Sequence, residues 1–407
     1  MIKRIIARVA LAVLVGAVLL VHIISRLIFF RRTPFKTPCR VLMIGTFESP
    51  GWLLAHAGPL SACKAVSEVG IVCTTPFDID LPKIRFYCPS RRTIDIFGRQ
   101  LARIIILLKV AIAERPSIYM GYHIMPNSLY ALVLARVFGG RAIYQMTGGP
   151  IQLIGGGYQS ENPLLAATGA PCRFMEYILF SLVRCFDIVI VRGKKAQSFV
   201  RQHQLAKQCF IITGAIDTDR FTPASGEKDF DILYVGRLVN DKGVEQCIRV
   251  AAKLRNLNSR YRLGIVGDGP LQGKIQNMAC EYRVDQNVHF FGKVTAVERV
   301  LSRARLFLLL SPSEGMSIAM LEAMSCGLPA VVSDVGDLAD AFEKRPVGVL
   351  LNGGSAVDIA NQVNKSLKNK DELSKFSLNA RKTICERFSV QAIARRWQEI
   401  LICMRNG

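Results

Sequence analysis

Acidic side chains are scarce in this chain of 407 residues. It carries 31 Asp and Glu against 53 Lys and Arg, for a formal net charge of +22. The excess is uneven, because residues 1–222 hold 27 basic and 11 acidic residues whereas residues 223–407 hold 26 and 20. Nucleic acid and anionic lipid headgroups both attract such charge. The sequence shows no nucleic-acid-binding module, so we expect no nucleic-acid partner and favour anionic lipids.

The sequence also lacks the spacings that metal sites require. None of its twelve cysteines forms a CxxC pair, and no Cys/His cluster stands at metal-ligand spacing. Single cysteines in apolar stretches are typical of buried, reduced thiols in the cytosol. No Asp-x-Asp pair follows a predicted strand end, where it would supply ligands to a divalent cation. We therefore expect neither a metal nor a cofactor.

The N-terminal segment contains a long apolar run over residues 9–25, which only His22 interrupts. If Arg26 snorkels, residues 5–30 suffice for a helix across a bilayer, which needs about 20 residues. A cleavable signal peptide is one alternative, but no small-x-small cleavage site follows the run. A helix lying in the membrane interface is another, but the run is apolar on all faces. We therefore expect residues 1–36 to form a membrane anchor with basic flanks.

The basic residues around this run predict its orientation. More Lys and Arg follow the run than precede it, so the positive-inside rule places the rest of the chain in the cytoplasm. The expected location is the cell (inner) membrane, with a single N-terminal pass and the folded domains on the cytoplasmic face.

Beyond the anchor, short β-branched runs alternate with longer amphipathic stretches, and the alternation restarts once. The predicted strands are 41–45, 70–74, 118–121, 142–146 and 187–191, then 232–235, 263–266, 288–290, 306–310, 330–333 and 347–351. The helices predicted between the first strands include 53–69, 94–113 and 128–137. This pattern predicts two doubly wound parallel sheets, each buried on both faces. The predicted parts are a first domain over 37–213, a linker over 214–230, a second domain over 231–388 and a C-terminal helix over 389–407 that returns to the first domain. Ligands of such sheets bind at the carboxyl ends of the strands, so we expect a cleft between the domains.

The richest motif is Ser-Pro-Ser-Glu-Gly-Met-Ser-Ile, which follows the strand at 306–310 and opens a helix. Glu314 precedes the helix, and Gly315 lets the chain turn tightly. The backbone N–H groups at the helix start can face a phosphate or sugar oxygen. These groups belong to Met316, Ser317 and Ile318.

Glu322 stands eight residues after Glu314, inside the helix and among apolar neighbours. A carboxylate there is costly unless it binds something, and vicinal ribose hydroxyls suit it because it accepts two hydrogen bonds. The alternative is that Glu314 complements the helix dipole and that Glu322 is merely exposed. Two glutamates at this spacing indicate a ligand-binding site more specifically than either residue does alone.

A second motif follows the strand at 232–235. Gly236 lets the backbone pass close to a ligand. Arg237 and Lys242 then flank a turn into a helix, where two cations would neutralise a diphosphate and stabilise it as a leaving group. Ordinary surface cations are the alternative.

Two further strand ends carry glycines. In Gly267-Asp-Gly the glycines serve close packing, and Asp268 more naturally caps the next helix than touches a ligand. After the strand at 288–290, Gly292 gives room for backbone hydrogen bonds to a nucleobase.

In this order and spacing, these motifs resemble the donor half of family-4 retaining glycosyltransferases of GT-B fold, of a membrane-anchored bacterial type. The segment 214–223 also resembles the interdomain join of that family. The resemblance covers roughly residues 38–400 in layout and is most specific between 214 and 336.

The resemblance implies a role for each motif residue. Arg237 and Lys242 would hold the donor diphosphate, Glu322 the ribose and Glu314 the transferred sugar. Ser317 replaces the glycine that is common at its position in the family, which would narrow the pocket but keep the backbone donors.

The first domain is less legible. His123 follows the strand at 118–121, and the resemblance implies that it contacts the donor sugar; a structural role at the strand end is the alternative. Gly45 resembles the glycine loop of the family, although the usual paired glycines are missing. His56 and Arg192 either face the ligand or pack.

Together these features predict an enzyme, a hexosyltransferase-type, metal-independent, retaining glycosyltransferase. It would move a sugar from a nucleotide diphosphate sugar to an acceptor hydroxyl. The anchor suggests a lipid-linked or cell-envelope glycan acceptor at the membrane. The alternatives are a GT-B nucleotide-sugar epimerase or hydrolase and a non-catalytic nucleotide-sugar-binding membrane protein. A catalytic pair of carboxylates in the first domain would favour an epimerase, and the sequence shows no such pair.

Overall fold

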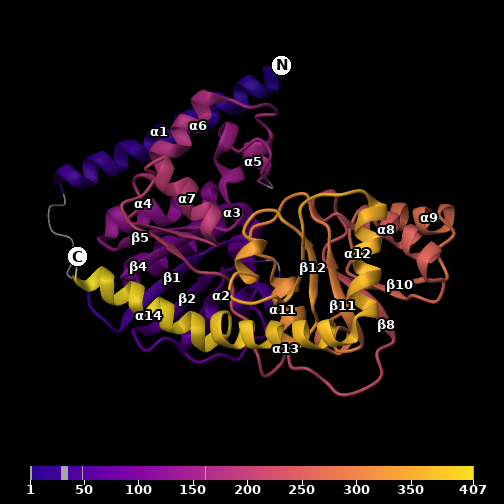
Figure 1. Ribbon diagram of the computed structural model, residues 1–407. Coiled ribbons are helices and arrows are strands. Elements are labelled where there is room, and N and C mark those ends of the chain that lie inside the picture. Colours follow the sequence, from indigo (N-terminus) through magenta and orange to yellow (C-terminus); the bar gives the residue numbers. More distant parts are fainter. Residues whose placement is uncertain (1, 29–34, 48, 161, 407) are drawn as a thin grey trace. The chain divides into compact units, whose positions relative to one another are not determined.

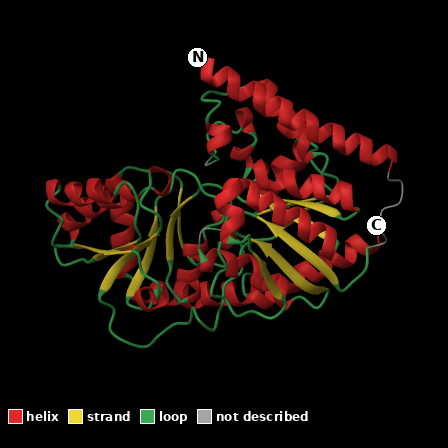
Figure 2. Cartoon of the chain, turned by 180° about the vertical axis from the view of Figure 1, so that it is seen from behind, coloured by secondary structure: helices red, strands yellow, loops and turns green. Residues whose placement is uncertain are grey.

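The computed structural model describes residues 2–28, 35–47, 49–160 and 162–406 (Figure 1). These form two compact units. Unit 1 comprises Met1–Thr213 together with Ile393–Gly407, and unit 2 comprises Gly214–Ala392. Each unit is an α/β sandwich whose sheet is entirely parallel, with helices flanking the strands (Figure 2). This confirms the prediction of two doubly wound parallel-sheet domains.

The sheet of unit 1 has seven strands, and its order reverses between β1 and β4. Across the sheet the strands are β3 (Ile84–Tyr87), β2 (Val66–Val72), β1 (Cys39–Ile44), β4 (Ile118–Tyr122), β5 (Arg141–Met146), β6 (Ile188–Val191) and β7 (Cys209–Ile211). The central strands are continuous apolar runs because helices cover both faces of the sheet. The reversal is a topological switch point, where sheets of this type open a crevice for ligands.

Helices connect these strands. They are α1 (Ile2–Ile28), α2 (Pro50–Ala62), α3 (Arg91–Glu114), α4 (Leu129–Phe138), α5 (Pro163–Ala166), α6 (Arg173–Val183) and α7 (Lys194–Gln202), with short turns η1 (Ile124–Ser128), η2 (Pro150–Gln152) and η3 (Ile154–Gly156). Ser49 caps α2 by accepting a hydrogen bond from the Trp52 amide at 3.2 Å. A helix predicted over 53–69 therefore ends early, because the chain turns extended at Cys63 and pairs as β2. The short strands β3 and β7 were not predicted.

The N-terminal helix α1 packs on its own unit. Leu11, Val15, Val18 and His22 recur at three- and four-residue spacing and are buried, and the helix contacts α4 and α6. Arg136 Nε donates to His22 Nδ1 at 3.0 Å. The opposite side leaves large apolar side chains exposed: Val9, Val13, Leu14, Leu20 and Ile23.

No helix of the described chain is both long and apolar enough for a membrane crossing. This corrects the prediction of a membrane-spanning helix over residues 5–30. One side of the apolar run is used to cover the helices of unit 1, which periodicity along the run did not reveal. Residues 29 and 30 lie outside the described residues.

The sheet of unit 2 has six strands, and its order reverses between β8 and β11. Across the sheet they are β10 (Val288–Gly292), β9 (Leu263–Val266), β8 (Phe230–Val235), β11 (Ala304–Leu309), β12 (Ala330–Ser333) and β13 (Gly348–Leu351). The helices are α8 (Val244–Leu257), α9 (Gln272–Glu281), α10 (Val297–Leu301), α11 (Ile318–Ser325), α12 (Ala356–Lys368) and α13 (Lys370–Arg387), with short turns η4 (Asn240–Lys242) and η5 (Leu338–Ala341).

The C-terminal helix α14 (Val390–Asn406) belongs mostly to unit 1, from Ile393 onward. Gln398 Oε1 accepts hydrogen bonds from the Ala65 amide at 2.9 Å and from Cys63 Sγ at 3.3 Å. Trp397 is buried. Unit 1 is thus built from two stretches of chain separated by all of unit 2.

Candidate functional site

The loop after β8 carries the predicted cations of unit 2. It runs from Gly236 to Gly243, where φ is +64°, and a Cβ on Gly243 would stand 1.9 Å from the Leu310 carbonyl oxygen. Only glycine allows this approach. The loop therefore lies against the end of β11, at the switch point of the sheet.

Lys242 and Glu314 meet at this point. Lys242 Nζ donates to Glu314 Oε1 at 2.8 Å, and Ser311 Oγ donates to the same oxygen at 3.1 Å. The Glu314 side chain is only 8% exposed. A carboxylate so deeply placed needs such partners to offset its lost hydration. The structure thus pairs Lys242 with Glu314. The family resemblance of the sequence assigns Lys242 to the donor diphosphate and Glu314 to the transferred sugar.

The Glu314 loop is held from its other side by the loop after β12. At Gly336 φ is +53°, and a Cβ would stand 1.7 Å from the Glu314 carbonyl oxygen. The Asp337 amide donates to the Gly315 carbonyl at 3.1 Å. The backbone at Glu314 is therefore fixed before any ligand arrives.

The start of α11 presents backbone donors beside Glu314. Ser317 is the N-cap residue, and its Oγ accepts from the Met320 amide at 3.3 Å. Within the described residues, no protein group accepts a hydrogen bond from the amides of Met316, Ser317 and Ile318. Unsatisfied amides at a helix N-terminus are an anion-binding feature. A serine in place of the family's glycine thus acts as a helix cap.

Glu322 lies inside α11, eight residues after Glu314. Its carboxyl has no hydrogen-bond partner among the described residues. Burial raises the pKa of Glu322 to about 7, opposed by the charge of Arg220 and reinforced by that of Glu298. A carboxyl group that is costly to ionise and lacks a protein partner is a candidate ligand contact.

The other predicted glycines of unit 2 bring strand ends close together. The Gly236 amide donates to the Val266 carbonyl at 3.0 Å, and the Gly267 amide donates to the Gly292 carbonyl at 2.9 Å. A Cβ on Gly267 would stand 1.9 Å from the Gly236 carbonyl oxygen. No atom lies within 4 Å of the position a Cβ would take on Gly292, where φ is +64°. Open space therefore adjoins Gly292 at the end of β10.

In unit 1, His123 follows β4 in a strained conformation with φ of +61°. Its Nδ1 lies 2.9 Å from Gln152 Nε2 and 3.0 Å from Thr147 Oγ1. Tyr144 OH in turn donates to Gln152 Oε1 at 2.8 Å. The sequence did not predict that Thr147 or Gln152, both in the chain after β5, would contact His123. A strained, oriented histidine at a switch point is typical of a functional position.

Gly45 directly follows β1, and a Cβ there would stand 2.8 Å from the Phe47 ring. Its carbonyl accepts a 2.6 Å hydrogen bond from Nη2 of the buried Arg103. The sequence missed Arg103 because α3 carries many exposed basic residues that resemble it. Gly45 and His123 thus lie in unit 1, whereas the other predicted site residues lie in unit 2.

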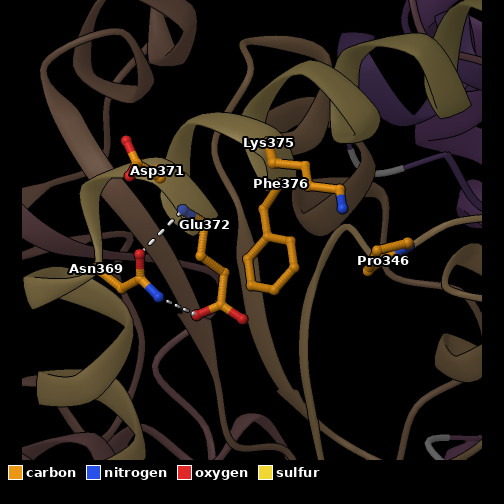
Figure 3. Close-up of a pocket in the computed structure, with 6 residues that line it drawn as sticks. All are labelled: Pro346, Asn369, Asp371, Glu372, Lys375 and Phe376. Atoms are coloured by element: carbon orange, nitrogen blue, oxygen red, sulfur yellow. Dashed lines mark hydrogen bonds between the residues drawn. The ribbon is translucent and has the colours of Figure 1, made fainter.

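Two cavities are found among the described residues of unit 2. One, of about 490 Å³, is lined by residues around the start of α13 and contains no predicted site residue (Figure 3). Asn369 and Glu372 there hydrogen-bond each other as a helix cap, so their polar atoms serve the fold. A smaller cavity of about 230 Å³ lies at the ends of β11, β12 and β13, where Ser311 and Asp334 contribute to its lining.

Comparison with known proteins places a family within unit 2. Residues 215–383 match the family Glycosyl transferases group 1. One curated relative is the N-acetyl-alpha-D-glucosaminyl L-malate synthase of Bacillus anthracis, 26% identical over 174 residues, or 43% of this chain and 45% of the relative. Another is the poly(ribitol-phosphate) alpha-N-acetylglucosaminyltransferase of Staphylococcus aureus (strain COL), 22% identical over 231 residues, or 56% and 46%. The matched stretches span about half the length of these curated relatives.

Solved structures resemble nearly the whole chain. Sucrose-phosphate synthase from Thermosynechococcus elongatus gives a TM-score of 0.71 at 17% identity and covers 90% of this chain and 98% of that one. Anabaena Alr3699/HepE in complex with UDP and glucose gives 0.69 at 16% identity and covers 90% and 100%. WaaG, a glycosyltransferase involved in lipopolysaccharide biosynthesis, gives 0.64 at 18% identity and covers 89% and 99%. These similarities show the GT-B fold.

Proposed function

We propose that this chain is a retaining glycosyltransferase that moves a sugar from a nucleotide diphosphate sugar to an acceptor hydroxyl. The observation that carries the proposal is the strand-end arrangement of unit 2. There the Lys242–Glu314 pair and the free amides at the start of α11 lie at one switch point. The family match over residues 215–383 supports it.

In the proposed reaction, the bond between the sugar C1 and the diphosphate oxygen breaks. Arg237, Lys242 and the α11 amides take up the charge that develops on the leaving diphosphate. Glu322 holds the ribose, and Glu314 holds the transferred sugar. The departing phosphate covers one face of the oxocarbenium-like centre and accepts the proton of the acceptor hydroxyl, whose oxygen bonds to C1 on that face. The anomeric configuration is thereby retained.

We propose that neither a metal ion nor a cofactor takes part, and that the nucleotide sugar is a co-substrate. A divalent cation neutralises a diphosphate in many enzymes. Here two cationic side chains and a helix N-terminus supply that positive charge.

The proposed acceptor is a lipid-linked or cell-envelope glycan intermediate, used at the cytoplasmic face of the cell (inner) membrane. The exposed apolar side of α1 and the basic first half of the chain suit a surface of anionic lipids. The Staphylococcus aureus relative is named as a glycosyltransferase of poly(ribitol-phosphate), a polymer that carries phosphate.

The Glu314→Gln substitution tests the proposal. It keeps the size of the side chain but removes the charge that pairs with Lys242. We expect kcat for sugar transfer to fall by on the order of 10²-fold, as when one electrostatic contact to a transition state is lost. Nucleotide affinity should stay within a few-fold of the unsubstituted protein. The donor for this assay is first identified by testing which UDP-, GDP- or ADP-sugar raises the melting temperature of the protein.

The matched control is Glu281→Gln, which removes an exposed carboxylate at the end of α9 and should leave both quantities unchanged. Undiminished transfer by the Glu314 variant would refute the role of this residue. Donor breakdown without transfer to any acceptor would instead point to a hydrolase or epimerase.

A further inference from the structure

Unit 1 holds a second polar cluster at the carboxyl ends of its central strands. Arg192 directly follows β6, and its Nη2 lies 3.1 Å from Nε2 of His56 on α2, the helix after β1. In the sheet, β4 and β5 separate β6 from β1. The contact therefore links the chain that follows β6 to α2, the helix that follows β1.

The charge of Arg192 is buried without compensation from the described residues. The residue is only 5% exposed, and within the described chain no carboxylate forms an ion pair with it. Burial lowers the pKa of Arg192 to about 10, so the guanidinium remains charged at neutral pH. A buried cation with no counter-charge is expensive, and proteins retain such groups where a ligand supplies the charge.

His56 does not supply the missing charge. Burial and the neighbouring Arg192 and His123 hold the pKa of His56 well below its usual range, so the ring is neutral. A neutral imidazole has a single acceptor nitrogen, whereas the guanidinium has five donors. Most of the hydrogen-bonding capacity of Arg192 is therefore left for another group.

Two aromatic rings pack against His56 in this cluster. The Trp52 and His56 rings have centroids 4.2 Å apart, and the buried Tyr122 ring lies 5.7 Å from His56. Arg103, a second buried cation, donates to the carbonyl of Gly45, the residue that follows β1. Cationic side chains set among aromatic rings favour a compact anion over a neutral sugar.

We propose that Arg192, with His56 beside it, binds an anionic group of the acceptor, either a phosphate or a carboxylate. This inference rests on the proposed function and names the class of acceptor. The donor diphosphate is the other possible source of such an anion. We assign the site to the acceptor because unit 2 has its own cations and amides for the diphosphate.

The test measures anion binding to the full chain by isothermal titration calorimetry. The donor site is first saturated with whichever of UDP, GDP and ADP binds most tightly. Inorganic phosphate and glycerol 3-phosphate are then titrated, with glycerol as the uncharged comparison. We expect the two phosphates to bind and glycerol not to bind. Arg192→Gln should weaken the phosphates at least tenfold, because a charge-assisted pair is lost.

The matched control is Arg99→Gln, which removes an exposed arginine of unit 1 and should leave phosphate binding unchanged. Arg192→Lys keeps the charge but loses the planar guanidinium group, so we expect its affinity for phosphate to be intermediate. If Arg192→Gln does not fold, the comparison is made with Arg192→Lys instead. Phosphate binding that is unaffected by either Arg192 variant would overturn the proposal. Competition between the nucleotide and phosphate would assign Arg192 to the donor and overturn it too.

These outcomes are separable from failure of the proposed function. Phosphate titration requires no turnover, whereas the Glu314 experiment requires sugar transfer. A chain that binds phosphate through Arg192 but transfers no sugar from any nucleotide donor would refute the proposed function. A chain that transfers sugar equally well to neutral and phosphorylated acceptors would refute only the acceptor class.

Discussion

Two carboxylates of unit 2, one in the loop before α11 and one inside that helix, have opposite electrostatic settings. Glu314 accepts hydrogen bonds from Lys242 and Ser311, so its charge is matched before a ligand arrives. Glu322 has no such partner among the described residues, and burial raises its pKa to about 7. Glu314 is thus held by protein partners, whereas Glu322 exchanges a proton near neutral pH. The difference predicts a pH dependence that belongs to Glu322.

We expect the ligand-free protein to lose stability as the pH rises from about 4.5 to about 7, and Glu322→Gln to flatten this loss. The folded chain keeps a proton on Glu322 that the unfolded chain, with a pKa near 4.5, has released. The stability from this group is therefore full below pH 4.5 and falls as the pH rises through the folded pKa. The effect should be on the order of 1–3 kcal/mol, measured by thermal unfolding at several pH values.

Nucleotide binding should depend on pH in the opposite sense. The ionised carboxylate accepts two ribose hydrogen bonds, so affinity should rise between pH 6 and pH 8 more steeply in the unsubstituted protein than in Glu322→Gln. Because phosphate ionisation is common to both proteins, the difference between the two profiles isolates Glu322. Equal slopes would mean that this residue does not touch the ribose.

At the scale of elements, glycines fix the strand-end loops of unit 2 against one another. The loop after β8 touches the end of β11 at Gly243, and the loop after β12 touches the Glu314 backbone at Gly336. Each glycine also has a positive φ. The loops that carry the candidate site are therefore positioned by backbone contacts that any side chain would break.

Gly243→Ala should destabilise unit 2 by at least about 2 kcal/mol, because alanine at this φ is strained and its Cβ would strike the Leu310 carbonyl. Nucleotide affinity should fall as well, since Lys242 is the adjacent residue. Thermal unfolding and nucleotide titration would measure both effects.

Gly273→Ala in α9 is the matched control. It has ordinary backbone angles and no atom within 4 Å of the new Cβ, so it should be neutral or stabilising by up to about 1 kcal/mol. If Gly243→Ala behaved like this control, the loop would not need the close approach that the structure shows.

At the scale of the whole molecule, the two ends of the chain both belong to unit 1. Helix α1 covers α4 and α6, and the residues of α14 from Ile393 onward complete the same unit. Removing residues 1–36 would therefore have two effects. It would expose part of the unit 1 core, and it would delete the exposed apolar side chains on the outer side of α1. Substitutions on the outer side separate the two effects.

We expect Val13→Ser combined with Leu20→Ser to weaken binding to vesicles of anionic phospholipid at least tenfold. Both side chains are more than half exposed, at 67% and 57%, and each apolar side chain is worth roughly 1.5–3 kcal/mol when fully buried. The stability of unit 1 should change little. Vesicle co-sedimentation and thermal unfolding of the full chain would measure the two quantities.

Val357→Ser, which removes an exposed apolar side chain in α12 of unit 2, is the matched control for vesicle binding. Val15→Ser, on the buried side of α1, should instead lower stability, because Val15 is fully buried. Vesicle binding that survives the double substitution would show that α1 does not face the lipid.

The sequence by itself determined the fold class of both units and the approximate positions of their longer strands. Strand and helix formation depends on periodicity and on glycine punctuation over a few residues, which can be read locally. The motif that ends in Glu322 was legible for the same reason, since a loop and the helix after it are continuous in the chain. The helix predicted beyond Ala62 failed where apolar residues suit a helix and a strand equally, and only pairing with β1 decided between them.

Only the tertiary structure decided which side chains meet. The Lys242–Glu314 pair joins residues 72 apart, and Arg192 meets His56 across 136 residues. The apolar run near the N-terminus contained no sign that one side of it would be covered by α4 and α6. Such partners depend on the packing of distant segments, and local periodicity carries no information about them.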